Sequence, residues 1–308
     1  MNTLNKSTNK KILIIGGTGF LGYHLTKKCL LKKWDVTSIS TNRPKKMRFL
    51  PKVKYLILDI TKKKLLLKKV KSNYDFVVNF GGYVNHNEKS KTYKSHYAGC
   101  KNLADLFKNK TIKSFIQIGS SVEYGNTKSP QSENVKTDVK KLKSSYGKAK
   151  LMATNYLLKL NKKYNFPCTI LRLYLVYGPC QDNNRLISHT LNECLNDNTF
   201  MCSAGKQYRD FLFVEDFIRA IFKCFNRKKA IGEIINIGTG KPRNVKKVIL
   251  FIKNKINLGK PVFGKISLRR DEIFRLYPNI SKAKKILNWK PYTSFQKGIE
   301  TVIRYYKS

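Results

Sequence analysis

Residues 11–22, Lys-Ile-Leu-Ile-Ile-Gly-Gly-Thr-Gly-Phe-Leu-Gly, join an apolar run to a glycine-rich loop. The run has the length of a buried β-strand, and a helical pattern of apolar residues follows the loop. The glycines satisfy both G-x-G-x-x-G, counted from Gly17, and G-x-x-G-x-x-G, counted from Gly16. Between a strand and a helix, this spacing lets the backbone approach a pyrophosphate, which lies at the positive end of the helix. The stretch therefore predicts a dinucleotide-binding loop.

Strand-like and helix-like segments alternate through the first half of the chain. We expect strands at 11–16, 35–40, 54–59, 75–80, 113–119 and 168–174, and helices at 20–33, 62–71, 90–109 and 144–164. This alternation predicts an α/β fold, a Rossmann-type doubly wound parallel sheet with helices on both faces. Ligands of such sheets bind at the carboxyl ends of the strands.

The pattern becomes less regular after Pro179. We expect helices near 185–197, from Asp216, near 244–256 and near 281–287, with strands at Asp210–Val214 and 234–237. The sequence predicts a dinucleotide-binding Rossmann domain over 1–178 with a return segment at about 208–240. The smaller substrate-binding lobe is expected mainly over 179–308.

The composition is that of a folded chain with a large core, because 41% of the 308 residues are hydrophobic. The seven cysteines are odd in number and form no C-x-x-C pair, which favours reduced thiols in the cytoplasm over disulfides or a zinc site. We see no signal-peptide pattern and no apolar run of membrane-spanning length. The four histidines share no ligand spacing, so we expect no metal site.

The net charge of +45 needs an explanation. Nucleic-acid or anionic-membrane binding is one interpretation. The basic residues are mostly lysines spread along the whole chain, however, and no nucleic-acid-binding motif accompanies them. We therefore favour a lysine-biased composition over a nucleic-acid role. A positive field still attracts anionic substrates.

Tyr146 and Lys150 are four residues apart in a predicted helix, so both lie on one helical face. A neighbouring cation favours the charged form of a phenol, which suits proton exchange near neutral pH. The pair alone is also compatible with chance in a lysine-rich chain.

Ser120 and Ser121 follow the buried-strand pattern Phe115-Ile-Gln-Ile-Gly119. They are therefore expected at the carboxyl end of a strand, the same edge as the glycine loop. A serine hydroxyl there can stabilise charge that develops on a substrate oxygen. An ordinary turn-starting serine is the structural alternative.

Together these features resemble the extended short-chain dehydrogenases/reductases, in the epimerase/dehydratase family that acts on nucleotide sugars. The resemblance covers nearly the whole chain. Its motifs are Gly16–Gly22, Asp59, Phe80–Gly82, Gly119–Gly125, Tyr146–Lys150, Val176–Pro179, Arg209–Asp216, Asn236–Gly240 and Ser281–Trp289.

The resemblance implies a role for each matching residue. Tyr146 is the acid/base, Lys150 holds the nicotinamide ribose and tunes Tyr146, and Ser120 orients the reacting oxygen. The implied cofactor-binding residues are Gly16, Gly19, Phe20, Leu21, Gly22, Ser40, Arg43, Asp59, Ile60, Phe80, Gly81, Gly82, Tyr146 and Lys150. The implied substrate-binding residues are Ser121, Arg209, Arg269 and Arg270, since arginine suits bidentate phosphate contacts.

Some positions depart from the family pattern. Dehydratases of the family carry Asp-Glu after the serine or threonine, whereas this chain has Ser121 and Val122, so we disfavour dehydration. Glu123 comes one residue later and, by strand alternation, is expected to face the other way. A helix asparagine of the family is replaced by His96, and the asparagine before Val-Tyr-Gly-Pro by Leu175.

The end of the second strand bears on the choice of cofactor. An acidic residue there accepts from the ribose 2′-hydroxyl of NAD and repels a 2′-phosphate. Ser40 occupies this place, and Arg43 follows closely. We therefore favour NADP and keep NAD as the alternative. Arg43 as an ordinary surface cation is the competing interpretation.

Three hypotheses of function follow. The first is an NADPH-dependent reductase of a 4-keto nucleotide sugar. It is supported by the C-terminal run Arg270-Asp-Glu-Ile, Asn279 and Leu287-Asn-Trp-Lys-Pro, which is similar to that of bacterial nucleotide-activated 3,6-dideoxyhexose synthases. The second is an NAD-dependent 4-epimerase that uses the same residues. The third is a non-catalytic Rossmann protein that binds RNA. The family resemblance also implies a homodimer formed through a bundle of the helices at 90–109 and 144–164, although core packing explains their apolar stripes equally well.

Overall fold

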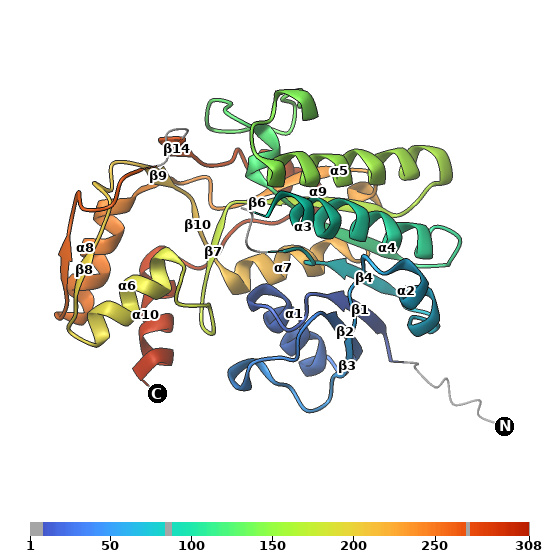
Figure 1. Ribbon diagram of the computed structural model, residues 1–308, viewed down its shortest axis with the longest axis horizontal. Coiled ribbons are helices and arrows are strands. Elements are labelled where there is room, and N and C mark those ends of the chain that lie inside the picture. The colour runs from blue at the N-terminus through green and yellow to red at the C-terminus, as the bar shows by residue number, and fades with distance from the viewer. Residues whose placement is uncertain (1–8, 84–87, 269–271, 308) are drawn as a thin grey trace. The chain divides into compact units, whose positions relative to one another are not determined.

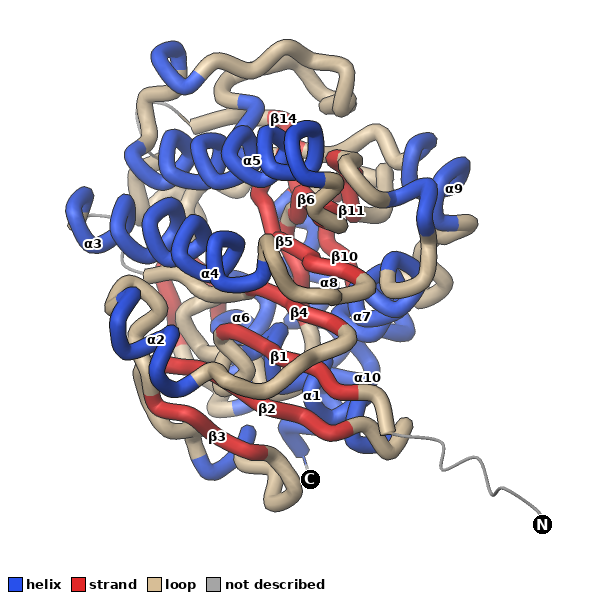
Figure 2. The backbone as a smooth tube through the Cα atoms, turned by 90° about the vertical axis from the view of Figure 1, so that its right-hand side faces the viewer, coloured by secondary structure: helices blue, strands red, loops and turns tan. Residues whose placement is uncertain are grey.

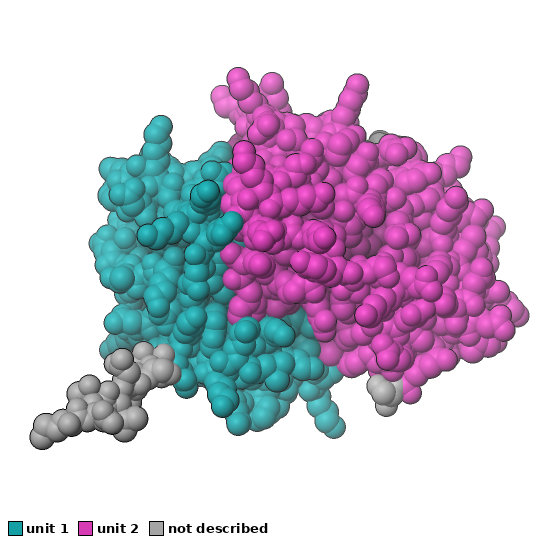
Figure 3. Space-filling model, turned by 180° about the vertical axis from the view of Figure 1, so that it is seen from behind, with its two compact units in different colours: residues 1–118, 148–170, 224–233 teal, residues 119–147, 171–223, 234–308 magenta. Residues whose placement is uncertain are grey.

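The computed structural model describes residues 9–83, 88–268 and 272–307. The chain divides into two compact units, which Figure 3 colours separately. The first unit comprises Met1–Ile118, Lys148–Ile170 and Cys224–Glu233, and the second comprises Gly119–Gly147, Leu171–Lys223 and Ile234–Ser308.

The main sheet has seven strands in the order β11-β6-β5-β4-β1-β2-β3. Their bounds are β1 Lys11–Ile15, β2 Asp35–Ser40, β3 Lys54–Ile57, β4 Phe76–Asn79, β5 Ser114–Ser120, β6 Cys168–Leu173 and β11 Ile234–Ile237. The pairs β1–β2, β1–β4, β2–β3 and β4–β5 are parallel. This confirms the predicted Rossmann-type sheet, and every predicted strand lies within two residues of its expected bounds.

The chain reverses its direction of winding beside β1, which lies between β4 and β2. A crevice for ligands forms at such a switch point, at the carboxyl ends of the strands. β1 itself is apolar and buried from Ile12 to Ile15, as expected for a strand that is covered on both faces. The fold therefore places the glycine loop at this edge.

Helices of the first unit cover both faces of its strands (Figures 1 and 2). Their bounds are α1 Phe20–Leu31, α2 Lys63–Lys69, α3 Lys89–Tyr93, α4 Gly99–Phe107 and α5 Ser145–Tyr164. α4 and α5 lie side by side, and Tyr156 of α5 donates a hydrogen bond to Asp105 of α4. α1 lies on the opposite face.

One predicted helix differs from the structure. Residues 90–109 were expected as a single α-helix, but a π-helical turn at Lys94–Ala98 separates α3 from α4. Such a turn inserts a residue without changing the apolar pattern much, so periodicity does not reveal it. π-turns are frequently found at functional sites, and this one carries the buried His96.

The second unit contains short strands and the helices that follow α5 along the chain. The elements are β7 Leu175–Tyr177, α6 Leu186–Leu195, β8 Thr199–Met201, β9 Tyr208–Arg209, β10 Phe211–Phe213, α7 Val214–Cys224, β12 Arg243–Asn244, α8 Val245–Ile256, β13 Lys260–Val262, β14 Arg275–Leu276, α9 Ser281–Leu287 and α10 Phe295–Lys307. Leu191 of α6, Ile252 of α8 and Ile299 of α10 meet in one hydrophobic core. Among the described residues, no helix has the length and apolarity needed to cross a membrane.

Candidate active site

The glycine loop closes tightly between β1 and α1. Gly16 has a φ of 79°, which favours glycine, and its N–H donates to the carbonyl of Ile39 at 2.7 Å. A methyl group at Gly22 would lie 2.2 Å from the carbonyl oxygen of Gly16. Only glycine therefore lets the first turn of α1, Phe20 to Gly22, press against the loop. The free N–H groups of that turn point to the space where an anion would bind.

Ser40 lies at the end of β2 and contacts the glycine loop. Its Oγ accepts a hydrogen bond of 3.3 Å from the N–H of Thr18. The following residues through Lys46 include no acid, and Arg43 is exposed. The end of β2 therefore presents a hydroxyl and a nearby guanidinium where NAD-specific enzymes carry a carboxylate.

The loop after β4 packs against the loop after β1. A methyl group at Gly16 would lie 3.3 Å from the backbone carbon of Phe80, so the two loops nearly touch. The N–H of Gly81 donates to Oδ1 of Asn79 at 2.9 Å. Gly82 lies against the ring of His96, where no side chain would fit. The structure thus brings together two of the predicted cofactor-binding segments.

Asp59 and Ile60 follow β3 at the same strand edge. Oδ1 of Asp59 accepts from the N–H of Thr61 at 2.8 Å, which forms a local turn. The carbonyl of Ile60 accepts from Nδ2 of Asn102 in α4 at 3.0 Å. These bonds fix the turn and leave Asp59 half-buried.

Lys150 is 4% exposed and extends from α5 toward β5. Its Nζ donates a hydrogen bond of 2.6 Å to the carbonyl of Ile118, two residues before Ser120 on the strand. Tyr146 lies one turn earlier on α5 and is half-buried. The Tyr-x-x-x-Lys pair therefore has the helical spacing that the sequence predicts.

Ser120 ends β5 and caps the short 3₁₀ helix Ser121–Tyr124. Its Oγ accepts from the N–H of Val122 at 3.4 Å, and its own N–H donates to Oε1 of Glu123 at 2.8 Å. This capping box fixes the backbone of Ser120 and leaves the residue half-buried. Ser121 is buried.

Glu123 does not occupy the strand position that its expected orientation assumed. Strand alternation does not apply to it, because β5 ends at Ser120 and the 3₁₀ turn brings the carboxylate back toward that residue. Glu123 is fully buried and forms an ion pair of 3.0 Å with Arg172 of β6, which is 1% exposed. Burial alone would lower the pKa of Arg172, but Glu123 raises it above its usual value.

Arg209 is the predicted phosphate-binding residue that the structure describes. Its guanidinium forms an ion pair with Glu272 and donates to the carbonyl of Tyr208 at 2.8 Å. Burial lowers the pKa of Arg209, although Glu272 opposes the shift. Arg269 and Arg270 lie outside the described residues.

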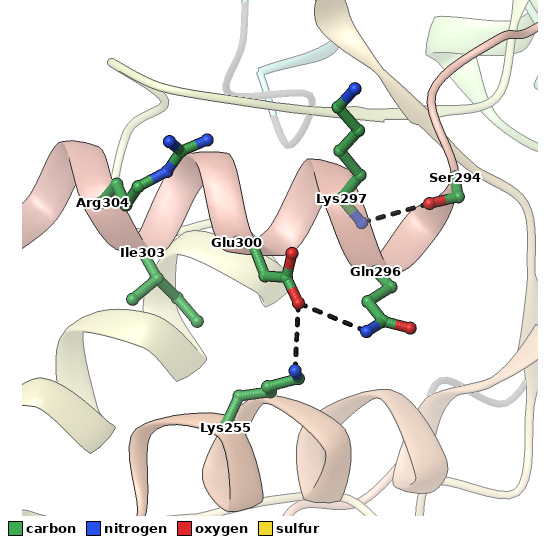
Figure 4. A pocket seen from close by; sticks show the side chains of 7 residues that line it. All are labelled: Lys255, Ser294, Gln296, Lys297, Glu300, Ile303 and Arg304. Atoms are coloured by element: carbon green, nitrogen blue, oxygen red, sulfur yellow. Dashed lines mark hydrogen bonds and ion pairs between the residues drawn. The ribbon is translucent and has the colours of Figure 1, made fainter.

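A surface hollow of about 670 Å³ lies between α8 and α10 (Figure 4). In its floor, Glu300 accepts hydrogen bonds from Lys255 and Gln296. None of the predicted site residues lines this hollow. The part of the chain that the structure describes also contains no cluster of metal-ligating side chains.

Residues 12–238 match the protein family described as the NAD dependent epimerase/dehydratase family. The chain belongs to this family. The match includes the glycine loop, Ser120, Tyr146 and Lys150, and it confirms the enzyme class inferred from those residues. The protein is therefore an enzyme of the short-chain dehydrogenase/reductase type.

Several relatives align with the protein over nearly its whole length. A putative UDP-glucose 4-epimerase of Methanocaldococcus jannaschii is 29% identical over 96% of this chain and 98% of its own. The CDP-abequose synthase of Salmonella muenchen is 24% identical over 96% of this chain and 97% of its own. The solved structure of the UDP-glucuronic acid 4-epimerase of Bacillus cereus, in complex with UDP-glucuronic acid and NAD, is 25% identical in sequence. It superposes with a TM-score of 0.84 and covers 96% of this chain and 99% of its own.

The sequence analysis did not single out three buried polar residues beside the site, namely Asn79, Gln117 and Arg172. A signal exists for two of them. Asn79 ends the apolar run Phe76-Val-Val, and Gln117 interrupts Phe115-Ile-Gln-Ile, so each is a polar residue within a strand buried on both faces. Buried polar side chains require partners, which makes such interruptions informative.

Proposed function

We propose that this enzyme transfers a hydride from NADPH to C4 of a nucleoside-diphosphate 4-keto sugar. The observation that carries the cofactor choice is Ser40, which bonds the glycine loop where an acid would repel a 2′-phosphate. Arg43 follows at an exposed position and is the proposed partner of that phosphate. The positive charge of the chain favours an anionic substrate.

At Gly16, Gly22 and Gly81 a side chain would meet Phe80, the Gly16 carbonyl and Ile15, so these glycines let the loops after β1 and β4 pack closely. The dinucleotide is proposed to bind at these loops, with its pyrophosphate at the N-terminus of α1. Asp59 is the proposed adenine contact, and the segment Phe80 to Gly82 the proposed contact of the nicotinamide half. When bound, the reduced nicotinamide supplies the hydride.

The remaining roles belong to side chains of β5 and α5. Tyr146 donates the proton that the C4 oxygen takes up, and Ser120 donates a hydrogen bond that stabilises the same oxygen. Lys150, one helical turn from Tyr146, is the proposed ligand of the nicotinamide ribose. Arg209 is the proposed diphosphate ligand, and it must exchange its carboxylate partner Glu272 for the phosphates.

The second candidate is an NAD-dependent 4-epimerase, which the names of relatives favour. Both reactions use the same three residues but differ in redox balance. A reductase consumes one NADPH per sugar, whereas an epimerase returns the hydride to its substrate. Dehydration is disfavoured because Ser121 and Val122 cannot exchange the protons that it requires.

The deciding experiment begins with mass spectrometry of cofactor retained by the purified protein. Turnover is then measured with NADPH and NADH on a panel of nucleoside-diphosphate 4-keto-6-deoxyhexoses. Stoichiometric NADP⁺ formation supports the reductase. Retained NAD, interconversion of C4 epimers and no net oxidation support the epimerase. Tyr146→Phe is the control, and we expect it to lose roughly 10²- to 10⁴-fold in kcat for either reaction.

We also propose that the enzyme is a cytoplasmic homodimer joined through α4 and α5. The seven cysteines are buried and form no disulfide, which fits a reducing compartment. Tyr93 ends α3 and is 45% exposed, and its ring contacts Tyr97. Sedimentation velocity distinguishes this dimer from a monomer.

A further inference from the structure

Two side-chain amides are buried where the central strands of the sheet run side by side. Asn79 of β4 pairs in register with Gln117 of β5, and each residue is 1% exposed. Nδ2 of Asn79 donates to Oε1 of Gln117 at 2.8 Å. Central parallel strands are ordinarily apolar on both faces, and buried polar groups lower stability unless they are fully bonded. The two amides therefore call for an explanation.

One end of this amide pair holds the loop after β4. Oδ1 of Asn79 accepts the N–H of Gly81 at 2.9 Å. A methyl group at Gly81 would lie 2.6 Å from Cγ2 of Ile15, so the loop lies directly against the end of β1. Asn79 thereby fixes the direction of the Gly81 backbone beside the glycine loop.

The other end of the pair leads to Lys150. Nε2 of Gln117 donates to the carbonyl of Ile118 at 3.1 Å, and the same carbonyl accepts Nζ of Lys150 at 2.6 Å. Oε1 of Gln117 also accepts from Sγ of Cys100 at 3.2 Å. An unbroken chain of hydrogen bonds thus runs from the Gly81 N–H to the Lys150 ammonium.

We propose that Asn79 and Gln117 are positioning residues, which set the Gly81 turn and the Lys150 ammonium in one fixed geometry for the dinucleotide. The amide of Gln117 directs the Ile118 carbonyl, and that carbonyl locates Lys150. Hydrogen bonds in such a chain polarise one another in a medium of low dielectric, so loss of one link weakens its neighbours. This inference rests on the proposed function, because it assumes that the Gly81 loop and Lys150 bind the dinucleotide.

A purely structural role makes a different prediction. If the amides only satisfy each other, replacing both with apolar groups of similar shape should be nearly neutral for the whole protein. Asn79→Leu/Gln117→Leu removes the pair and leaves no unpaired side-chain amide, but it also removes the acceptor of the Gly81 N–H and the Gln117 donor to the Ile118 carbonyl. Positioning and packing are therefore separable in this double variant.

The test titrates NADPH and NADH against the full chain by cofactor fluorescence, with thermal unfolding measured in parallel. We expect the double variant to unfold within a few degrees of the wild type, while its dissociation constant for the preferred cofactor rises at least tenfold. Thr169→Val is the matched control. It removes a hydrogen bond of 2.8 Å from a residue 1% exposed in β6, and it should leave cofactor affinity within twofold.

The outcomes separate the two proposals. If the double variant binds the cofactor with wild-type affinity, the inference is overturned and the proposed function is left intact. A wild-type chain that binds neither dinucleotide overturns both. If the double variant is too unstable to titrate, Gln117→Met keeps the side-chain length and removes the amide's hydrogen bonds with Asn79, Cys100 and the Ile118 carbonyl. The same tenfold loss is expected there, and unchanged affinity contradicts the inference.

Discussion

The buried carboxylate of Glu123 accepts the backbone N–H of Ser120 at 2.8 Å. The same carboxylate is paired with Arg172, and both side chains are almost completely buried. The proposed catalytic serine is thus held by an ion pair and not by an ordinary turn alone. Removing one charge of such a pair leaves the other desolvated and unbalanced.

Glu123→Gln is expected to lower the free energy of unfolding by about 3–5 kcal/mol, because the Arg172 cation then remains buried without its partner. Urea denaturation at pH 7 measures the change. Glu300→Gln serves as the comparison, since it breaks an exposed ion pair. In that pair the side chain of Glu300 is 41% exposed and that of Lys255 is 38% exposed. Exposed pairs contribute little, so a loss at Glu123 no larger than that at Glu300 contradicts the argument.

Gly19 and Gly22 allow the fold and cofactor roles of the loop to be separated. Gly22→Ala forces a methyl group onto the Gly16 carbonyl, and overpacking of this kind destabilises by about 1–3 kcal/mol. At Gly19 the nearest atom lies 3.3 Å away and φ is −79°, so Gly19→Ala is tolerated by the backbone.

We therefore expect Gly22→Ala to lower both the melting temperature and dinucleotide affinity. Gly19→Ala should lower affinity alone, because its methyl group faces the proposed pyrophosphate position. Thermal unfolding and cofactor titration of the two variants provide the measurement. Equal melting temperatures for both variants would show that the close approach of Gly22 to the Gly16 carbonyl does not contribute to stability.

Ser40→Asp places a carboxylate at the end of β2. It is expected to repel a 2′-phosphate and accept from a ribose 2′-hydroxyl. The ratio of kcat/KM for NADPH to that for NADH should fall about tenfold to a hundredfold, the equivalent of a charge-assisted bond of ~1.5–3 kcal/mol. Arg43→Ala should reduce the NADPH value alone, and Lys46→Ala is the control for loss of a nearby surface charge. An unchanged ratio in Ser40→Asp rejects the NADP preference.

Much of the first unit could be predicted from sequence. The glycine loop, β1 and α1 follow from local patterns that reinforce one another: an apolar run, a fixed glycine spacing and a helical stripe. Tyr146 and Lys150 were also predictable, because a four-residue spacing in a helix fixes their relation without any tertiary information.

Other features depend on contacts between distant segments. The inward turn of Glu123 could not be predicted, since it requires knowing that β5 stops at Ser120 and that Arg172 of β6 lies opposite. The apolar pattern of the sequence likewise does not reveal the π-helical turn before α4. Helix α10 was missed although Phe295, Ile299 and Val302 have helical spacing, because the surrounding residues are polar.

Asp105 links α4 to α5 and makes stability depend on pH. Burial alone would raise the pKa of Asp105, but hydrogen bonds from Lys101 and Tyr156 hold it below its usual value. A carboxyl with a depressed folded-state pKa stabilises the fold above its unfolded-state pKa of about 4, and this contribution disappears as pH falls through the folded-state value.

Asp105→Asn should therefore reduce the free energy of unfolding by about 1–2 kcal/mol at pH 7, as expected for lost hydrogen bonds to a charged group. Below about pH 3 the wild type and the variant should converge, because the wild-type carboxyl is then protonated too. Urea unfolding from pH 7 to pH 2.5 follows this difference. Tyr156→Phe removes one donor and keeps the titrating group, so its difference from the wild type should also shrink toward acid. A difference that is constant with pH would mean that Asp105 stabilises the α4–α5 contact by packing and not by its charge.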